Sequence, residues 1–261
     1  MRTKWLAVAA ALWLGAPLSA QQNPPPAQPP EPAAQQKLDA LLVRWENEMK
    51  AIQTLVAQCN RTTVNKTFQT TDDFEGTASF MKPNMAMLKM QKKGRPDVFE
   101  LFICAGTKVY EYVPQNRIVR VHEMPPSKNG QQLGDDSSFL SFLFGMKAEE
   151  AKRRYQLTLD REDQFYYYLM VLPRFPEDRA DFQKARLVLT KQSFLPRELW
   201  FVQPNGDEIR WDIPRIDNGA KLNPTDFTNP QAPPGWTMQR VPRATEVPAN
   251  NVPPRVVRPN G

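Results

Sequence analysis

From Asn60 onward the chain is a close succession of short strand-like runs separated by turns of a few residues. Threonine, valine and aromatic residues dominate these runs, as they do in β-strands. The predicted strands lie at 60–69, 76–82, 85–92, 97–104, 107–113, 117–122, 155–161, 165–172, 184–191, 195–203 and 207–213. Connections this short join antiparallel neighbours. The chain is therefore constrained to a large antiparallel sheet.

The turn signals between the runs support this prediction. Asn205–Gly206 is a strong hairpin signal, because both residues tolerate the positive φ of a tight turn. The other predicted turns are Asp72–Asp73, Lys82–Asn84, Lys93–Pro96, Ala105–Gly106 and Pro114–Asn116.

One amphipathic helix precedes the strands, at about 37–57. Its apolar residues recur at three- and four-residue spacing, with charged residues between them. They are Leu38, Leu41, Leu42, Trp45, Met49, Ile52 and Leu55. We expect this stripe to pack on the sheet.

A short, strongly apolar helix is predicted at 138–145, followed by a charged helix from Lys147 to Arg154. The apolar residues of the first are Phe139, Leu140, Phe142 and Leu143. Such a helix can be a fixed part of the core, or a lid that fills an empty cavity and leaves when ligand enters.

These elements predict an α+β fold. A sheet of about 11 strands curls into a half-open antiparallel β-barrel, which the long N-terminal helix and the short apolar helical lid close. A curled sheet closed by helices makes a cavity.

Both ends differ from the middle. Residues 1–20 begin with Arg2 and Lys4, continue into a short apolar run and end in Ser19–Ala20, which predicts a secretory signal peptide. The alternative is an uncleaved anchor helix. Residues 21–36 form a Pro-rich spacer, 37–238 the half-barrel domain, and 239–261 a Pro/Arg-rich disordered tail. We expect an exported, periplasmic protein.

The net charge of +6 is concentrated at these ends, so the body of the chain is nearly neutral. It shows no basic stripe interleaved with exposed aromatics, and nucleic-acid binding is not expected. Export permits a disulfide between the two cysteines, Cys59 and Cys104. Two buried, reduced thiols are the alternative, and both interpretations stay open.

The sequence gives little support to an enzyme. His122 is the only histidine, no G-x-S-x-G or glycine-rich phosphate loop is present, and the acidic run 160–163 fits no calcium loop. No catalytic residue, cofactor or metal is predicted.

Several phrases, in this order, resemble the LolA-like outer-membrane lipoprotein carriers across roughly 37–236. They are Gly76-Thr-Ala-Ser-Phe-Met-Lys82-Pro83, Gly106-Thr-Lys-Val-Tyr-Glu-Tyr-Val-Pro114 with Ile118-Val-Arg-Val121, the apolar insert 138–145, and Pro224-Thr-Asp-Phe227 with Pro233-Pro-Gly-Trp236. The resemblance implies a periplasmic half-barrel whose hydrophobic cavity receives lipoprotein acyl chains. It also implies a lid held by a basic residue, Lys82, where the family commonly has arginine. Lysine would hold a lid through a single charge-assisted hydrogen bond.

The expected ligand-binding residues of the hydrophobic cavity are Phe80, Met85, Met87, Phe99, Leu101 and Ile103. Methionine suits a pocket whose contents vary in shape, and the alternative is that these residues fill an ordinary core. Alternation in 97–104 predicts that Phe99, Leu101 and Ile103 face inward.

The predicted function is a non-covalent carrier of lipid or lipoprotein acyl chains, monomeric, that exchanges cargo with membrane-bound donor and acceptor proteins. The alternative, from a different class, is an envelope sensor or protein-binding scaffold with the same fold.

Overall fold

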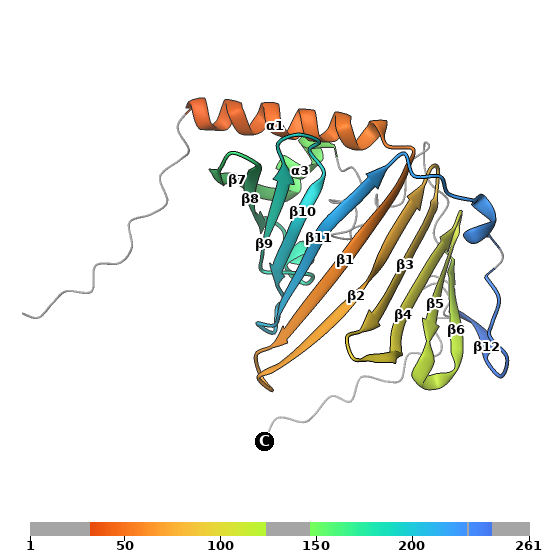
Figure 1. Cartoon of the computed structure of the whole chain (residues 1–261). Helices are drawn as coiled ribbons and strands as arrows, with labels where there is room; N and C mark the ends of the chain where they lie inside the picture. The colour runs from red at the N-terminus through yellow and green to blue at the C-terminus, as the bar shows by residue number, and fades with distance from the viewer. Residues whose placement is uncertain (1–31, 124–146, 229, 242–261) are drawn as a thin grey trace, which may run out of the picture.

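The structure, a computed structural model, describes residues 32–123, 147–228 and 230–241. One sheet of twelve strands forms most of it, in the order β12-β6-β5-β4-β3-β2-β1-β11-β10-β9-β8-β7 (Figure 1). All neighbours are antiparallel except β12, which runs parallel to β6. The predicted half-open antiparallel sheet is therefore confirmed, with one strand more than expected.

The strands are β1 Thr54–Asn65, β2 Thr70–Met81, β3 Met85–Lys92, β4 Arg95–Ala105, β5 Lys108–Val113, β6 Ile118–Glu123, β7 Tyr155–Glu162, β8 Tyr166–Pro173, β9 Lys184–Thr190, β10 Pro196–Val202, β11 Glu208–Asn218 and β12 Thr237–Val241. The α-helices are α1 Pro32–Ala51, α3 Ala148–Arg154 and α4 Pro176–Arg179, and the 3-10 helices are η1 Pro114–Asn116 and η3 Pro224–Asp226.

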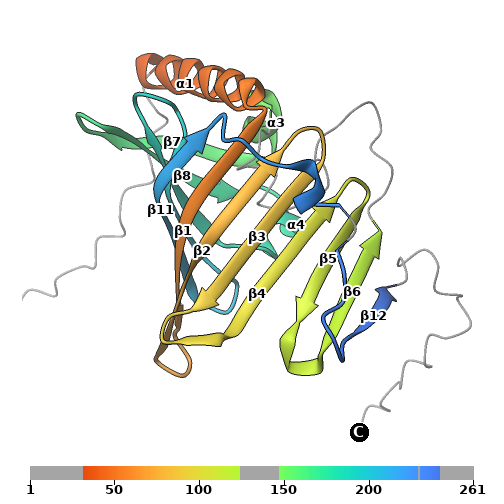
Figure 2. The ribbon, with the colours of Figure 1, turned by 45° about the vertical axis from the view of Figure 1, so that its right-hand side comes forward.

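The sheet curls into an open half-barrel, and α1 lies across one end of it (Figures 1 and 2). In both views α1 runs over β7–β11 and ends near β1, so β4, β5 and β6 lie beyond its end. The helix thus covers one half of the curled sheet and leaves the other half beyond its reach.

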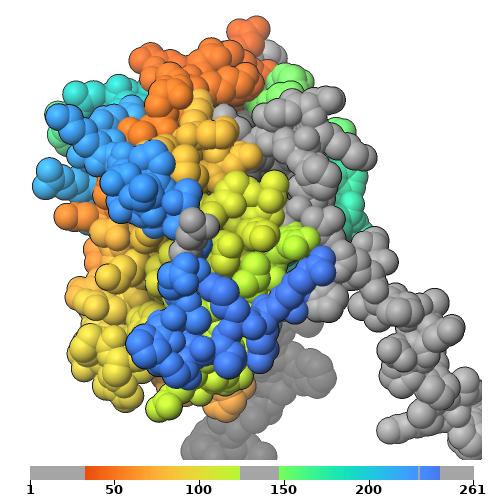
Figure 3. All heavy atoms as spheres, turned by 90° about the vertical axis from the view of Figure 1, so that its right-hand side faces the viewer, coloured from red at the N-terminus to blue at the C-terminus, as the bar shows by residue number. Residues whose placement is uncertain are grey.

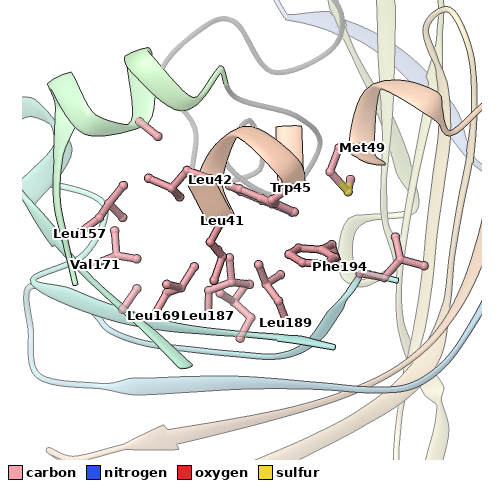
Figure 4. Close-up of a cluster of buried hydrophobic side chains, with 14 of the residues drawn as sticks. Leu41, Leu42, Trp45, Met49, Leu157, Leu169, Val171, Leu187, Leu189 and Phe194 are labelled. Atoms are coloured by element: carbon pink, nitrogen blue, oxygen red, sulfur yellow. The ribbon is translucent and has the colours of Figure 1, made fainter. Parts of the chain in front are cut away.

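The main core lies between α1 and the sheet. Leu41, Leu42 and Trp45 on α1 are at most 5% exposed, and their side chains point at strands β7–β9 (Figure 4). There they meet Leu157, Leu169, Val171, Leu187 and Leu189. Burial of this many large apolar side chains, each worth about 1.5–3 kcal/mol, makes the helix an integral part of the domain.

The helix ends earlier than its apolar spacing predicted. It stops at Ala51, and Leu55 belongs to β1, where it lies on the buried face together with Ala57 and Cys59. The β-branched residues Thr54 and Val56 favour the strand. Leu55 fits the helical stripe and the strand face equally well, because the helical spacing and the strand alternation both place an apolar residue at position 55.

Two polar contacts join the helices to one another. The Glu46 carboxylate on α1 accepts a hydrogen bond from the Ala148 amide at the start of α3, at 2.8 Å. At the other end of α3, Arg154 forms an ion pair with Asp178 of α4, which is only 2% exposed. Breaking a buried pair by removing one partner leaves an uncompensated charge, so this link helps fix α3 and α4.

Several predicted boundaries need correction. The turn between the first two strands is Lys66–Gln69, and Asp72 and Asp73 lie within β2. Helix α1 begins at Pro32, inside the expected spacer, and β12 runs past residue 238 to Val241. The expected signal peptide and the apolar insert at 138–145 lie outside the described residues.

None of the helices in the described ranges is long and apolar enough to cross a membrane.

Candidate functional site

The register of the strands separates the two faces of the sheet. Ala57, Ala78, Leu88 and Phe102 are successive cross-strand partners on β1 to β4, so they share one face. Ala57 belongs to the core under α1, which makes this the inner face of the half-barrel.

The inner face continues beyond the main core onto β4, β5 and β6. There the register places Phe102, Val109, Val113 and Ile118 on the same face as Leu88 of β3, and the row that continues directly from Leu88 and Phe102 is Glu111 and Arg120. Phe102 is 36% exposed and the others are half-buried. We call the five apolar residues the inner apolar face. Because α1 ends before it, this surface offers partly uncovered apolar side chains inside the curl of the sheet.

A charged pair crosses the inner face beside these residues. Arg61 on β1 donates two hydrogen bonds to Glu100 on β4, at 2.7 and 2.6 Å. The guanidinium also lies over the rings of Phe74 and Trp211, at 4.5 and 5.3 Å. A forked, stacked contact of this kind is strong and orients both partners.

A second polar group lies on β5 and β6. Glu111 meets His122 across the strand pair, at 3.0 Å, and Arg120 at 3.4 Å. The carboxylate that His122 contacts is Glu111, on the adjacent strand β5. The Arg61–Glu100 pair therefore borders the inner apolar face, whereas Glu111 and Arg120 cross it between Val109 and the Val113–Ile118 pair.

The outer face of the same strands has its own small core. Ile103, Tyr112 and Val119 are at most 9% exposed, and Trp236 packs against them. The Trp236 ring lies 6.4 Å from Phe99, and the Tyr112 hydroxyl donates to the Gln231 carbonyl at 2.9 Å. Figure 3 shows the segment that leads to β12, in blue, lying against the strands in yellow and green. It covers part of the outer face.

The predicted cavity residues do not line one cavity. Phe80 faces inward and is 8% exposed, as part of the main core. Met85, Met87, Phe99, Leu101 and Ile103 all lie on the opposite, outer face. The prediction that Phe99, Leu101 and Ile103 face inward is wrong, because β4 is apolar on both faces and its alternation alone cannot say which one is concave.

Lys82 contacts the helix. Its ammonium group donates to the Lys50 carbonyl near the end of α1, and its amide donates to the Gln53 carbonyl at 2.9 Å. A cation at a helix C-terminus is favourable. The predicted lid, Phe139, Leu140, Phe142 and Leu143, lies outside the described residues, so a lid-holding role for Lys82 stays a prediction.

The two cysteines are free and buried, which corrects the disulfide interpretation. They lie on β1 and β4, with β2 and β3 between them. Strands are about 4.8 Å apart, so two intervening strands exceed the reach of a disulfide. Burial raises the pKa of both thiols to about 11, and they stay protonated at neutral pH.

One pocket lies on the outer face. It is open and polar, with a volume of about 340 Å³, and is lined by Asn60, Thr62, Lys93, Arg210 and Asp212. Within the described residues, no three side chains of the types that bind metal ions lie together.

No family model matches the sequence, and no curated protein matches it. Solved structures similar to this chain include an uncharacterised conserved protein from Thermus thermophilus, with 9% identity and a TM-score of 0.48, covering 78% of this chain and 99% of that one. The Pseudomonas aeruginosa MucB–MucA complex matches with 10% identity and a TM-score of 0.43, covering 74% of this chain and 61% of that one. A LolA superfamily protein from Nitrosomonas europaea matches with 11% identity and a TM-score of 0.34, covering 75% and 97%. The last of these structures belongs to the superfamily that the sequence motifs resemble.

Proposed function

We propose that this protein is an exported carrier that binds the acyl chains of a lipid or lipoprotein on the inner apolar face of its half-barrel. The observation that carries the proposal is the position of α1, which covers one half of the curled sheet and ends before β4–β6. Binding is non-covalent.

The chemistry of this surface suits an acyl chain. Leu88, Phe102 and Val109 present hydrocarbon, and each methylene removed from water contributes about 0.8 kcal/mol. Several methylenes therefore suffice for useful affinity without any specific polar contact. Such binding is reversible, as a carrier requires.

The polar groups on this face suit the ester or headgroup end of a lipid. Arg61 and His122 lie on the same face as Phe102, each held by a carboxylate partner. A lipid places its ester or headgroup oxygens at one end of the chain, and N–H donors at the border of the apolar surface can bind these oxygens.

The apolar insert enters the proposal as the lid predicted from the sequence. Its connections start at Glu123, on β6 beside the inner apolar face, and end at α3, which packs on α1. The residues Phe139, Leu140, Phe142 and Leu143 would compete with the cargo for the same surface.

The test is native mass spectrometry, with lipid extraction, on the exported protein purified from an envelope fraction. Phe102→Glu places a charge on the inner apolar face and should abolish co-purification of acyl chains. Leu172→Glu is the matched control, because Leu172 is 40% exposed on the outer face of β8. Both variants should keep the circular dichroism spectrum of the parent.

Acyl chains that remain in the Phe102→Glu variant would refute the proposal. An empty protein that instead cross-links to envelope proteins would favour the sensor or scaffold alternative.

A further inference from the structure

Four tight turns lie at the end of the sheet opposite α1, and we call them the turn rim: residues 66–69, 93–94, 114–117 and 203–207. The β8–β9 connection, which contains α4 and the exposed Glu177 and Asp181, lies at the same edge, and its Gln183 side chain donates to the Pro204 carbonyl at 3.0 Å. The four tight turns connect β1 to β2, β3 to β4, β5 to β6 and β10 to β11. Because these strands are antiparallel neighbours, their turns share one edge, at the bottom of Figures 1 and 2. The first turn protrudes, since residues 70–73 of β2 extend beyond the last paired residue of β3.

Phe68, at the tip of the first turn, is 77% exposed. Exposure of a large aromatic side chain to water is unfavourable. The turn that carries Phe68 is nevertheless held in place by hydrogen bonds. The Phe68 amide donates to the Asn65 side chain at 2.8 Å. Asp207, only 6% exposed, accepts from the Asn65 side chain and the Lys66 amide, at 3.1 and 2.9 Å. The phenyl ring is therefore held outward by a hydrogen-bonded support.

The exposed charges of the turn rim are all positive. Lys66, Lys93 and Arg117 are exposed, whereas the one carboxylate in these turns, Asp207, is buried. Lys66 shares its charge with Glu208 on the strand behind it, at 2.8 Å. Lys93 and Arg117 have no carboxylate partner among the described residues. On the strand behind the tip, Asp72 pairs with Lys92 and Asp73 accepts a hydrogen bond from Thr62. Lys93 and Arg117 therefore supply the positive charge beside the apolar tip, and this combination matches the surface of an anionic bilayer, with acyl chains below and phosphates above.

We propose that the turn rim docks on anionic membranes, with Phe68 inserted among the lipids and Lys66, Lys93 and Arg117 at the phosphates. The proposal concerns a different surface from the inner apolar face and does not depend on it. Docking there would bring the open end of the half-barrel to the bilayer.

The chain contains a matched control. Phe165, at the tip of the β7–β8 hairpin, is 61% exposed but lies beside Asp163, which accepts hydrogen bonds from the Phe165 and Tyr166 amides. This hairpin points away from the turn rim (Figure 1). The lysines beside this hairpin, Lys37 and Lys191, are paired with Glu162, so its phenylalanine tests exposure without the contribution of unpaired lysines.

The experiment measures co-sedimentation of the purified full-length exported protein with phosphatidylcholine vesicles, with and without phosphatidylglycerol. We expect binding only to the anionic vesicles, weakening as salt shortens the range of the charges. Phe68→Ser should reduce affinity about tenfold, and Phe165→Ser should bind as the parent does. Both sites are exposed, so thermal unfolding should be unchanged.

The charges are tested separately. Lys93→Gln with Arg117→Gln should reduce affinity roughly twentyfold at low salt. Lys89→Gln with Lys108→Gln, an equal change at exposed positions away from the turn rim, should have a much smaller effect. The tail is present in all variants and cancels in the comparison. Equal binding by the Phe68 and Phe165 variants would overturn the proposal. So would absence of vesicle binding together with cross-linking of the turn rim to an envelope protein.

Discussion

At the scale of single residues, the two faces of one strand decide where a ligand can bind. β4 carries Phe99, Leu101 and Ile103 on one face and Glu100, Phe102 and Cys104 on the other. Glu100 is the residue that misleads, because a carboxylate normally marks the solvent face. Here Arg61 neutralises it from the inner face of β1. Arg61 follows Leu55, Ala57 and Cys59 at two-residue spacing, which indicates that the buried face of β1 also carries a charged residue.

At Gly76 the neighbouring strand leaves no space for a side chain larger than hydrogen. Gly76 lies between Cys59 and Met90 on the inner face, and a Cβ built there would lie 1.9 Å from the Lys89 carbonyl oxygen. Backbone cannot move aside as a flexible side chain can. Gly76→Ala should therefore destabilise the domain by about 3 kcal/mol, measured as the free energy of urea unfolding.

Ser79→Ala, on the outward side of the same strand, is the comparison and should change stability by about 0.5 kcal/mol or less. If Gly76→Ala unfolds at the same urea concentration as the parent, the predicted clash between position 76 of β2 and the Lys89 carbonyl of β3 does not occur.

At the scale of elements, the contacts of α1 were only partly predictable. The apolar stripe from Leu38 to Met49 identified the helix and its buried side, because a sustained 3.6-residue period is typical of an amphipathic helix. Its end was not predictable, since Leu55 satisfies both the helix and the strand. The link from Glu46 to α3 was hidden, because it joins positions far apart in the sequence.

The Glu46 link should make stability depend on pH. Burial raises the pKa of this carboxyl. The hydrogen bonds from the Ala148 amide and Lys50 together lower the pKa by more than burial raises it, so the net pKa lies below the ordinary 4.5. The stabilisation is therefore present above this ordinary value and is lost as pH falls through the lowered one. Glu46→Gln should cost about 1 kcal/mol at neutral pH, as loss of a helix cap does.

The difference in unfolding free energy between the parent and Glu46→Gln should shrink below about pH 4.5. Glu48→Gln, on the exposed side of the same helix, is the control and should have a smaller effect at neutral pH. A difference that is constant with pH would show that Glu46 does not act through its charge.

At the scale of the whole molecule, most of the architecture could be predicted and the site could not. Short turns between β-rich runs dictate antiparallel order, and so nearly all strand neighbours, but they say nothing of which way a sheet curls. Curl is set by packing between distant parts, here α1 against β7–β9. The last strand was also missed, because β12 pairs in parallel with β6 after a long proline-broken segment.

The same distance between parts explains the misplaced cavity. The segment carrying Trp236 covers the outer face of β4–β6, which gives those strands two apolar faces, and only the three-dimensional arrangement distinguishes them. The inner apolar face is defined by where α1 ends, a property of the assembled molecule. Predictions from local pattern are accurate within strands and fail where two elements compete for one face.

The most direct test of acyl-chain binding is to locate a bound chain. A fatty acid carrying a photoactivatable diazirine would be cross-linked to the exported protein, and the modified peptides identified by mass spectrometry. We predict labels at Leu88, Phe102, Val109, Val113 and Ile118, reduced by an excess of unlabelled fatty acid. Competable labels confined to the outer face, at Met87, Phe99 or Trp236, would contradict binding on the inner apolar face.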